Sequence, residues 1–379
     1  MTAEIKTMPS GAPAMQRGAW LDFLRFFVAG LIILYHFHAA GPVDLATVHP
    51  VFGRGFLLTD FFLLDSGYVI ARIYATRVGR RMTYWEFVQK RFLRVVPGHL
   101  VMISGLAALV LLAGAFGVAP TNPEYFDWKE FPAQFFLLQS YGVPGGVGWN
   151  APTWSISALI GCYLLFPFLA RVLWRLEAWK ALALGVGFFL IADLLAHLLV
   201  QMPVYWMDFK YGIFRAVPLF LLGMSLARFS ETFYIPPRIA AAMGIGAFVV
   251  FAALEHFGPN GLAAMGLISV MVIAAAAIPV KQGSRFIQQG ALAAYAMFIT
   301  NEVVRIGYFG VADKVIETFG LSVPLQWVLW AVGVLSAFIF AFGFYKFFDA
   351  PTQAWFNRPK NARQPVEIGG LTKAEPPTS

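Results

Sequence analysis

The run LDFLRFFVAGLIILYHFHAAGP, residues 21–42, is long and apolar enough to cross a bilayer as a helix. It also carries Asp22, Arg25, His36 and His38. Charged and titratable side chains are costly in hydrocarbon, so within a span they usually face the interior of a helical bundle. The run therefore predicts a first membrane-spanning helix with a polar, functional face.

The whole chain has the composition of a membrane protein. Of its 379 residues, 59% are hydrophobic and 13% are charged, whereas roughly a quarter of the residues of a soluble domain are charged. Apolar windows recur from end to end, which predicts an all-α polytopic protein with one membrane domain. The single cysteine, Cys162, excludes an internal disulfide or a cysteine metal cluster. No metal site is expected.

Ten spans are expected, with both termini in the cytoplasm. The expected spans are 20–40, 52–71, 95–117, 152–170, 181–200, 213–228, 239–256, 261–279, 287–309 and 325–346. This topology puts most Lys and Arg residues on the inner side, as the positive-inside rule requires. It therefore explains the net charge of +8 without nucleic acid. The expected domains are a cytoplasmic tail 1–19, a membrane domain 20–348 and a largely disordered cytoplasmic tail 349–379.

A cleaved signal peptide is the alternative for the first run, because HAAG resembles a small-residue cleavage site. The apolar stretch is longer than a usual signal core and contains titratable residues. A retained first span is therefore favoured.

Two connecting segments are long enough to fold. The inner segment 72–94 mixes aromatic and basic residues, which predicts an interfacial amphipathic helix. The outer segment 118–149 combines Pro and Gly with aromatic and acidic residues, and it predicts a partly ordered cap over the outer mouth.

The first helix places its polar residues unevenly. Arg25 and His36 are eleven residues apart, which is three helical turns plus about 20°, and about 16 Å along the axis. Asp22 lies one turn before Arg25 on the same face, and His38 turns nearly opposite. His36 is therefore the better candidate for a buried reactive group. The alternative is that Asp22 and Arg25 pair at the interface while His36 bonds a neighbouring group.

The sequence RFLR, residues 91–94, opens the third expected span. Arg91 and Arg94 project together, and their planar guanidinium groups suit phosphate oxygens. With Arg81 and Lys90 nearby, they predict a seat for a phosphorylated cytosolic ligand. Anchoring to anionic lipid is the alternative.

The run TDFFLLDSGYVI, residues 59–70, places two carboxylates, Asp60 and Asp65, in an expected span. Carboxylates at this depth need partners. Arg25 or His36 is expected to supply them.

Further polar residues lie in later expected spans: Asp193, His197, Arg215, Asn301, Glu302 and Arg305. Asp193 and His197 are one turn apart, as in a proton-transferring pair, although such pairs are more often structural.

These pieces together resemble the acyltransferase-3 family of membrane O-acyltransferases. The signature is Arg25, ten residues, then His36, followed by Arg91-x-x-Arg94. The other matching elements, in chain order, are DFFLLDSGYVI, QKRFLRVVPG, TWSISALIGCYLLFP, FRAVPLFLLG, AYAMFITN and FDAP. Their order and spacing over roughly residues 20 to 355 make the resemblance specific.

The resemblance implies a fold of about ten spans and an activity. Members transfer an acyl group, usually acetyl, from cytosolic acyl-CoA to a sugar hydroxyl of an extracytoplasmic or lipid-linked glycan. It implies that His36 is the catalytic base, that Arg25 is its motif partner, and that Arg91 and Arg94 bind the phosphates of CoA. His36 either deprotonates the acceptor or carries the acyl group transiently.

The remaining candidate residues fall into three groups. They are Asp22 and Asp65 for catalysis, Arg81 and Lys90 for cofactor binding, and Asp60, Ser66, Trp154, Ser155, Arg215, Asn301 and Glu302 for substrate binding.

Three positions depart from the family pattern. Leu159 stands where the family carries Glu, and Asn301 stands where it carries His. Asp65 is an additional acid at an apolar family position. We hypothesise that Asp65 or Glu302 supplies the acidic function lost at Leu159.

The expected protein is therefore a multi-pass enzyme of a bacterial-type cytoplasmic (inner) membrane. Its expected partners are acetyl-CoA as acyl donor, a glycan or lipid-linked sugar acceptor, the lipid bilayer, and a separate extracytoplasmic acyl-relay or glycan-synthesis protein. The alternative from another class is a proton-coupled transporter or flippase that uses the intramembrane Asp, His and Arg residues. A catalytically silent scaffold is the third reading.

Overall fold

The computed structural model describes residues 19–358 except 119, 121–122, 144–147, 208, 234, 258–260 and 279–284. It is all-α: 83% of the model is helical, and no strand occurs in the described part. The expected tail 1–19 lies outside these residues except for Ala19, as does the expected tail from 359 onward.

Each of the ten expected spans overlaps one long helix. These helices are α1 Ala19–Phe37, α3 Phe56–Tyr74, α4 Tyr84–Ala115, α6 Trp154–Leu173, α7 Ala178–Val200, α8 Gly212–Ser230, α9 Pro237–Phe257, α10 Gly261–Ala277, α11 Arg285–Val304 and α13 Val323–Phe344. The short helices are α2 Leu45–Val48, α5 Phe131–Phe135, α12 Gly310–Phe319 and α14 Ala350–Phe356.

Seven segments of the described chain are long and apolar enough to cross a membrane. Helices α3, α10 and α11 are not among them. Helix α10 has 17 residues, whereas α3 carries Asp60 and Asp65, and α11 carries Glu302. The protein is therefore a multi-pass membrane protein, and the count of ten crossings stays a prediction.

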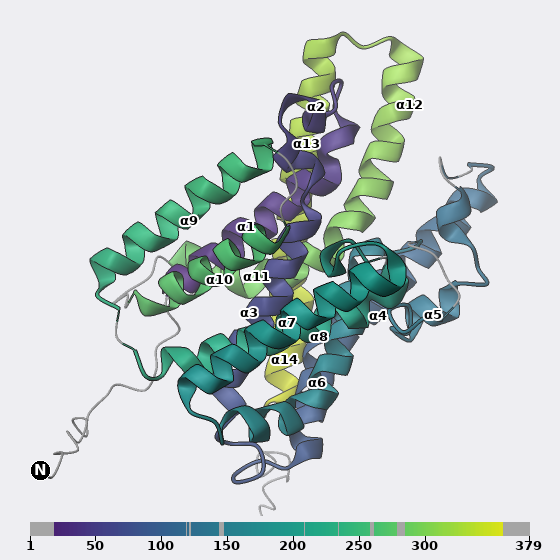
Figure 1. Cartoon of the computed structure of the whole chain (residues 1–379). Coiled ribbons are helices and arrows are strands. Elements are labelled where there is room, and N and C mark those ends of the chain that lie inside the picture. The colour runs from purple at the N-terminus through teal and green to yellow at the C-terminus, as the bar shows by residue number, and fades with distance from the viewer. Residues whose placement is uncertain are drawn as a thin grey trace, which may run out of the picture.

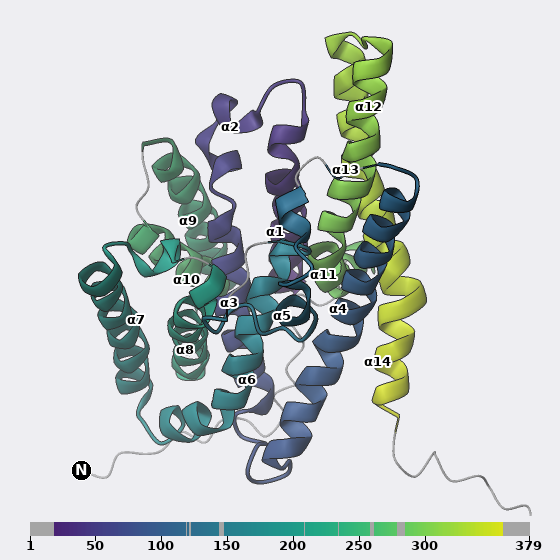
Figure 2. The same cartoon turned by 90° about the vertical axis from the view of Figure 1, so that its right-hand side faces the viewer.

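The long helices run up and down between two ends (Figures 1 and 2). Helix α2 and the α12–α13 turn lie at one end, here called the α12 end. The α3–α4 turn and α14 lie at the other, the α14 end. Helices α12 and α13 form a hairpin that stands beyond the other helices in both views.

Helices α3 and α8 cross at very short distance because glycines line the contact. A Cβ at Gly67 of α3 would overlap the backbone carbonyl of Phe220, and one at Gly223 of α8 would overlap that of Leu64. Small residues permit this approach between membrane helices. The crossing fixes the height of α3 against α8, and with it the polar residues that both helices carry.

The inner segment 72–94 does not form a separate interfacial helix, so that prediction was wrong. Residues 75–83 form a turn, and one continuous helix of 32 residues starts at Tyr84. A capping box fixes this start, because the Thr83 hydroxyl accepts from the Glu86 N–H while the Glu86 carboxylate accepts from the Thr83 N–H. The basic residues of RFLR therefore belong to α4 itself.

The described part of the outer segment 118–149 is partly ordered, as expected. It contains a 3₁₀ turn (η3, Pro123–Phe126) and α5. Trp149, which is 1% exposed, packs against Phe126, Trp128 and Phe131. This aromatic cluster holds the segment together.

Two π-helical turns interrupt the last helices. They are η7, Arg305–Phe309, between α11 and α12, and η8, Tyr345–Asp349, between α13 and α14. The chain is still helical from Asp349 to Phe356, so the first part of the expected disordered tail is ordered. Such turns are frequent at functional sites because they break the side-chain register of a helix.

Candidate active site

Helix α1 carries Arg25 and His36 to two different carboxylates. Arg25 meets Asp65 of α3, with Nε 3.1 Å from Oδ2. The Asp65 side chain is 1% exposed, so its charge needs this cation. Asp22 is half-buried one turn earlier.

His36 lies about three turns further along α1, against α11. Its Nδ1 is 3.8 Å from Oε2 of Glu302. Glu302 is in turn held by Arg305, whose Nη2 and Nε donate to the two carboxylate oxygens at 2.6 and 2.9 Å. The Tyr35 ring packs edge-on against the imidazole, with centroids 5.1 Å apart. One buried carboxylate therefore links a histidine and an arginine.

His38 takes another path, as its position on the helix predicts. Helix α1 ends at Phe37, and His38 begins a 3₁₀ turn. Its Nδ1 is 2.7 Å from Oδ1 of Asp44. The bond from His38 and a second from the Ala46 N–H lower the pKa of the Asp44 carboxyl. His38 is therefore a loop contact outside the His36 cluster.

The two arginines of RFLR are fixed at the α14 end. Arg91 donates from Nη2 to the Tyr74 hydroxyl at 2.9 Å. Arg94 donates from Nη1 to both oxygens of Asp349 at 2.8 and 3.0 Å, and its guanidinium stacks over the Tyr295 ring at 4.8 Å. Both guanidinium groups are thus oriented by the fold.

The three arginines converge on Tyr163 of α6. The charges of Arg25, Arg91 and Arg94 all act electrostatically on its hydroxyl, which is buried inside the bundle. Tyr163 joins the polar residues of α1 to those of α4, and sequence reasoning gave it no role. The signal was its place as the trailing Tyr of the TWSISALIGCYLLFP element.

Asp60 pairs with Arg215, so the expectation that Arg25 or His36 serves both carboxylates was wrong for Asp60. Arg215 donates from Nε and Nη2 to the two oxygens of Asp60 at 2.7 and 2.9 Å. Their side chains are 3% and 0% exposed. The Arg215 guanidinium also lies 5.2 Å from the centre of the Trp154 ring. The glycine-lined crossing of α3 and α8 brings this pair together.

Several other predicted residues have local contacts. Asn301 is fully buried, and its Nδ2 donates to Met297 O and Phe298 O of its own helix. Ser155 donates to Pro152 O. Ser66 is half-buried next to Gly67. These three contacts do not reach the His36 cluster.

The Asp193 and His197 pair has a structural contact. Asp193 accepts from the Val204 N–H at 2.9 Å, and His197 Nδ1 is 2.8 Å from the Asp193 carbonyl. The pair ties α7 to the following loop.

Two pockets border these clusters. The first, of about 360 Å³, lies in the α3–α4 turn and is lined by Thr76, Arg77, Arg80 and Arg81. Arg81 and Lys90 are exposed. Four basic side chains thus surround the approach to Arg91.

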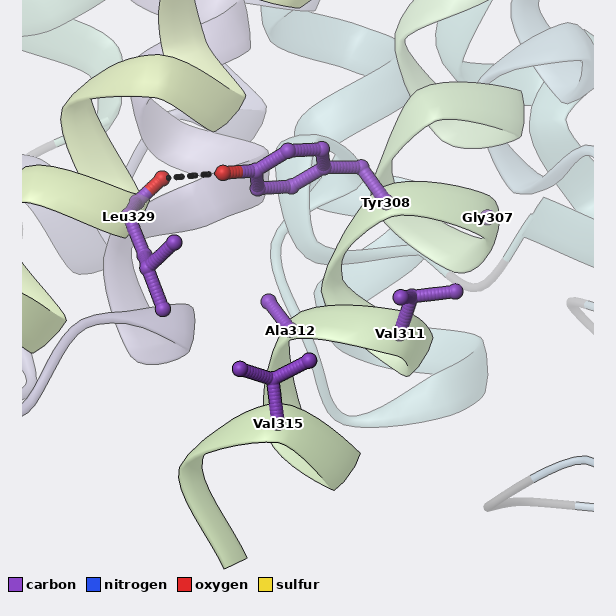
Figure 3. Close-up of a pocket in the computed structure, with 6 residues that line it drawn as sticks. All are labelled: Gly307, Tyr308, Val311, Ala312, Val315 and Leu329. Carbon is purple, nitrogen blue, oxygen red and sulfur yellow. Dashed lines mark hydrogen bonds between the residues drawn. The ribbon is translucent and has the colours of Figure 1, made fainter. Parts of the chain in front are cut away.

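The second pocket, of about 310 Å³, lies between α12 and α13 beside the turn η7 (Figure 3). Val311, Ala312, Val315 and Leu329 line it, and the Tyr308 hydroxyl donates across it to Leu329 O at 2.8 Å. Its apolar lining suits hydrocarbon rather than phosphate.

The family was decided by comparison with known proteins. A family profile described as an acyltransferase domain, acyltransferase-3, matches residues 19–346. The chain belongs to the acyltransferase-3 family. This confirms the resemblance drawn from the motifs, and membership indicates a membrane acyltransferase.

A curated relative agrees with this membership. Acyltransferase MdmB of Streptomyces mycarofaciens is 31% identical over 170 residues. The alignment covers 42% of this chain and 41% of that relative, so the chain matches less than half of the relative's length. No solved structure matches the chain.

One departure from the acyltransferase-3 pattern has a structural counterpart. Leu159 of α6, where the family carries Glu, is buried in the hydrophobic core. The carboxylate beside His36 instead comes from α11, at Glu302.

Proposed function

We propose that the protein moves an acyl group, with acetyl as the proposed group, from cytosolic acyl-CoA to a hydroxyl of an extracytoplasmic or lipid-linked glycan. The observation that carries this proposal is the placement of Arg25 and His36 on one face of α1 with separate buried carboxylate partners. The first cluster continues to the arginines of RFLR at the α14 end, and the second lies nearer the α12 end. A polar path thus joins two levels of the bundle.

The donor is proposed to enter at the α14 end. Arg91 and Arg94 are oriented there, and Arg77, Arg80 and Arg81 surround a pocket beside them. Guanidinium groups bind phosphate oxygens strongly. The phosphates of CoA would remain at this face while the flexible pantetheine arm carries the thioester past Arg25. The positive-inside rule makes this face cytoplasmic.

His36 is proposed to act as the base on the acceptor. It takes the proton from the acceptor hydroxyl as that oxygen attacks the thioester carbonyl, and the C–S bond then breaks. The imidazolium returns the proton to the leaving thiolate, so the products are an ester and free CoA. In the alternative route the acyl group rests on His36 before the acceptor takes it.

The cellular setting is proposed on the same grounds. The protein would lie in a bacterial-type inner membrane, where acetyl-CoA is available on one side only. A separate extracytoplasmic protein would relay the acyl group or assemble the glycan. The apolar pocket beside η7 would accommodate the lipid part of a lipid-linked acceptor.

Labelled acetyl-CoA tests this function. Membranes that contain the protein should incorporate acetyl label into glycan or lipid-linked sugar, and membranes that lack it should not. If label stays in CoA while the protein moves solute or lipid without acyl-CoA, the transporter alternative is correct instead.

The role of Arg91 can be measured through the donor. Replacing Arg91 with Gln (Arg91→Gln) should raise KM for acetyl-CoA about tenfold and change kcat little, because a charge-assisted phosphate contact worth about 1.4 kcal/mol is lost from ground and transition state alike. Arg175→Gln, an exposed arginine in the turn after α6, is the matched control and should leave KM unchanged. An equal rise in both variants would show that general surface charge is responsible.

A further inference from the structure

We propose that Glu302, held by Arg305, is the carboxylate that positions His36 for acyl transfer. The inference rests on the proposed function and assigns roles to two residues that the acyltransferase-3 motifs leave open. His36 is then the catalytic residue, and Glu302 and Arg305 are positioning residues.

The first argument is the geometry of the carboxylate. Arg305 grips both oxygens of Glu302, and this fixes the plane of the carboxylate. Oε2 is the oxygen shared between Arg305 Nε, at 2.9 Å, and His36 Nδ1, at 3.8 Å. The longer distance is typical of a catalytic contact that tightens when substrate binds. Because the Glu302 side chain is 5% exposed, water screens this contact little.

The second argument is the local backbone. Glu302 belongs to the regular part of α11, and Arg305 is the first residue of the π-helical turn η7. The two side chains lie three residues apart and share one face. The turn then resets the register of α12, so the pair is held where α11 passes α1. The phenol of Tyr125 also acts electrostatically on Arg305, which brings η3 to the same place.

The third argument separates Glu302 from the other candidate acid. Asp65 meets Arg25, 3.1 Å away, about three turns from His36 along α1. It holds the arginine of the motif. Glu302 is the acid that meets the histidine. The function lost at Leu159 is therefore divided, with the histidine partner supplied by α11.

This contact has a chemical consequence. With Nδ1–H directed to Glu302, the opposite nitrogen, Nε2, carries the lone pair that accepts the proton of the acceptor hydroxyl. The carboxylate also stabilises the imidazolium that forms when the proton arrives, and it does not itself need to be protonated. It thus acts through His36 and not on the acceptor.

The kinetic test compares kcat with KM in membranes supplied with labelled acetyl-CoA. Glu302→Gln should lower kcat about 100-fold and leave KM for acetyl-CoA unchanged, because the donor does not contact Glu302. Glu302→Asp, which keeps the charge, should recover part of this loss. Arg305→Lys, which keeps a cation without the two-pronged grip, should lower kcat about tenfold.

A double variant separates positioning from a structural role. If Glu302 acts through His36, adding Glu302→Gln to His36→Ala should cause no further loss of the residual rate. The control is Glu317→Gln, which removes the exposed Glu317–Lys314 pair of α12 and should leave kcat unchanged. Protein abundance and thermal unfolding in detergent are measured for each variant.

Three outcomes would overturn the inference. They are a wild-type kcat in Glu302→Gln, a further loss in the double variant equal to that in the single variant, and a Glu302→Asp variant as impaired as Glu302→Gln at equal abundance. If Glu302→Gln does not accumulate, Arg305→Lys and Glu302→Asp decide the question alone. An inactive wild-type protein would instead remove the proposed function on which the inference rests.

Discussion

His36→Ala should lower the rate of acyl transfer from labelled acetyl-CoA by about 1,000-fold or more. A positioned base contributes roughly 10² to 10⁴ to a rate, and alanine removes both the base and any acyl-carrying nitrogen. The side chain is 17% exposed and lies beside a buried carboxylate, so another base cannot readily take its place. The measurement is the initial rate of label incorporation at equal protein abundance.

His38→Ala is the matched control for this prediction. It lies two residues further along, contacts Asp44 in the loop, and should keep the rate within about twofold of wild type. If His36→Ala retains the wild-type rate, or if the two variants lose the same amount, His36 is not the base.

Asp60→Ala should destabilise the protein by about 3–5 kcal/mol. The change leaves the Arg215 guanidinium, 3% exposed, buried without its carboxylate, and such a charge costs far more than the net worth of the pair. The Arg215 contact with Phe56 O at 3.0 Å replaces only part of that interaction. The measurement is the free energy of unfolding in detergent, or the thermal midpoint at matched protein concentration.

Two comparison variants test the cause of that loss. Asp60→Leu combined with Arg215→Met removes both charges and should recover much of the stability, because an apolar pair fills the site without desolvated charge. Glu317→Ala breaks an exposed pair and should change stability by less than about 0.5 kcal/mol. A double variant as unstable as Asp60→Ala would show that packing, and not an unpaired charge, sets the cost.

The sequence predicted the helices well because each span is a long apolar run. Each of the ten expected segments overlaps a helix, since hydropathy and helix length are local properties. The break between a loop helix and the third span was wrong because nothing in residues 84–94 stops a helix. The capping box at Thr83 marks the start, and its sequence, Thr83-x-x-Glu86, was readable.

The pairings could not be read from the sequence in the same way. Periodicity placed Arg25 and His36 on one face, but it could not say which carboxylate each would meet. Asp60 and Arg215 are 155 residues apart, and Arg94 and Asp349 are 255 residues apart. Such partners depend on which helices pack together. Asp349 had a signal in the FDAP element, whereas the grip of Arg305 on Glu302 forms where the helix changes to a π-turn, which no local pattern marked.

Sidedness of the donor tests the central claim most directly. Sealed membrane vesicles that contain the protein are prepared inside-out and right-side-out, and labelled acetyl-CoA, which does not cross bilayers, is added outside. The account predicts that inside-out vesicles incorporate label, that the labelled glycan is sealed on the opposite face, and that right-side-out vesicles stay unlabelled until they are permeabilised. Equal labelling by intact vesicles of both orientations, or labelling from the right-side-out face alone, would contradict transfer from a basic inner face through His36.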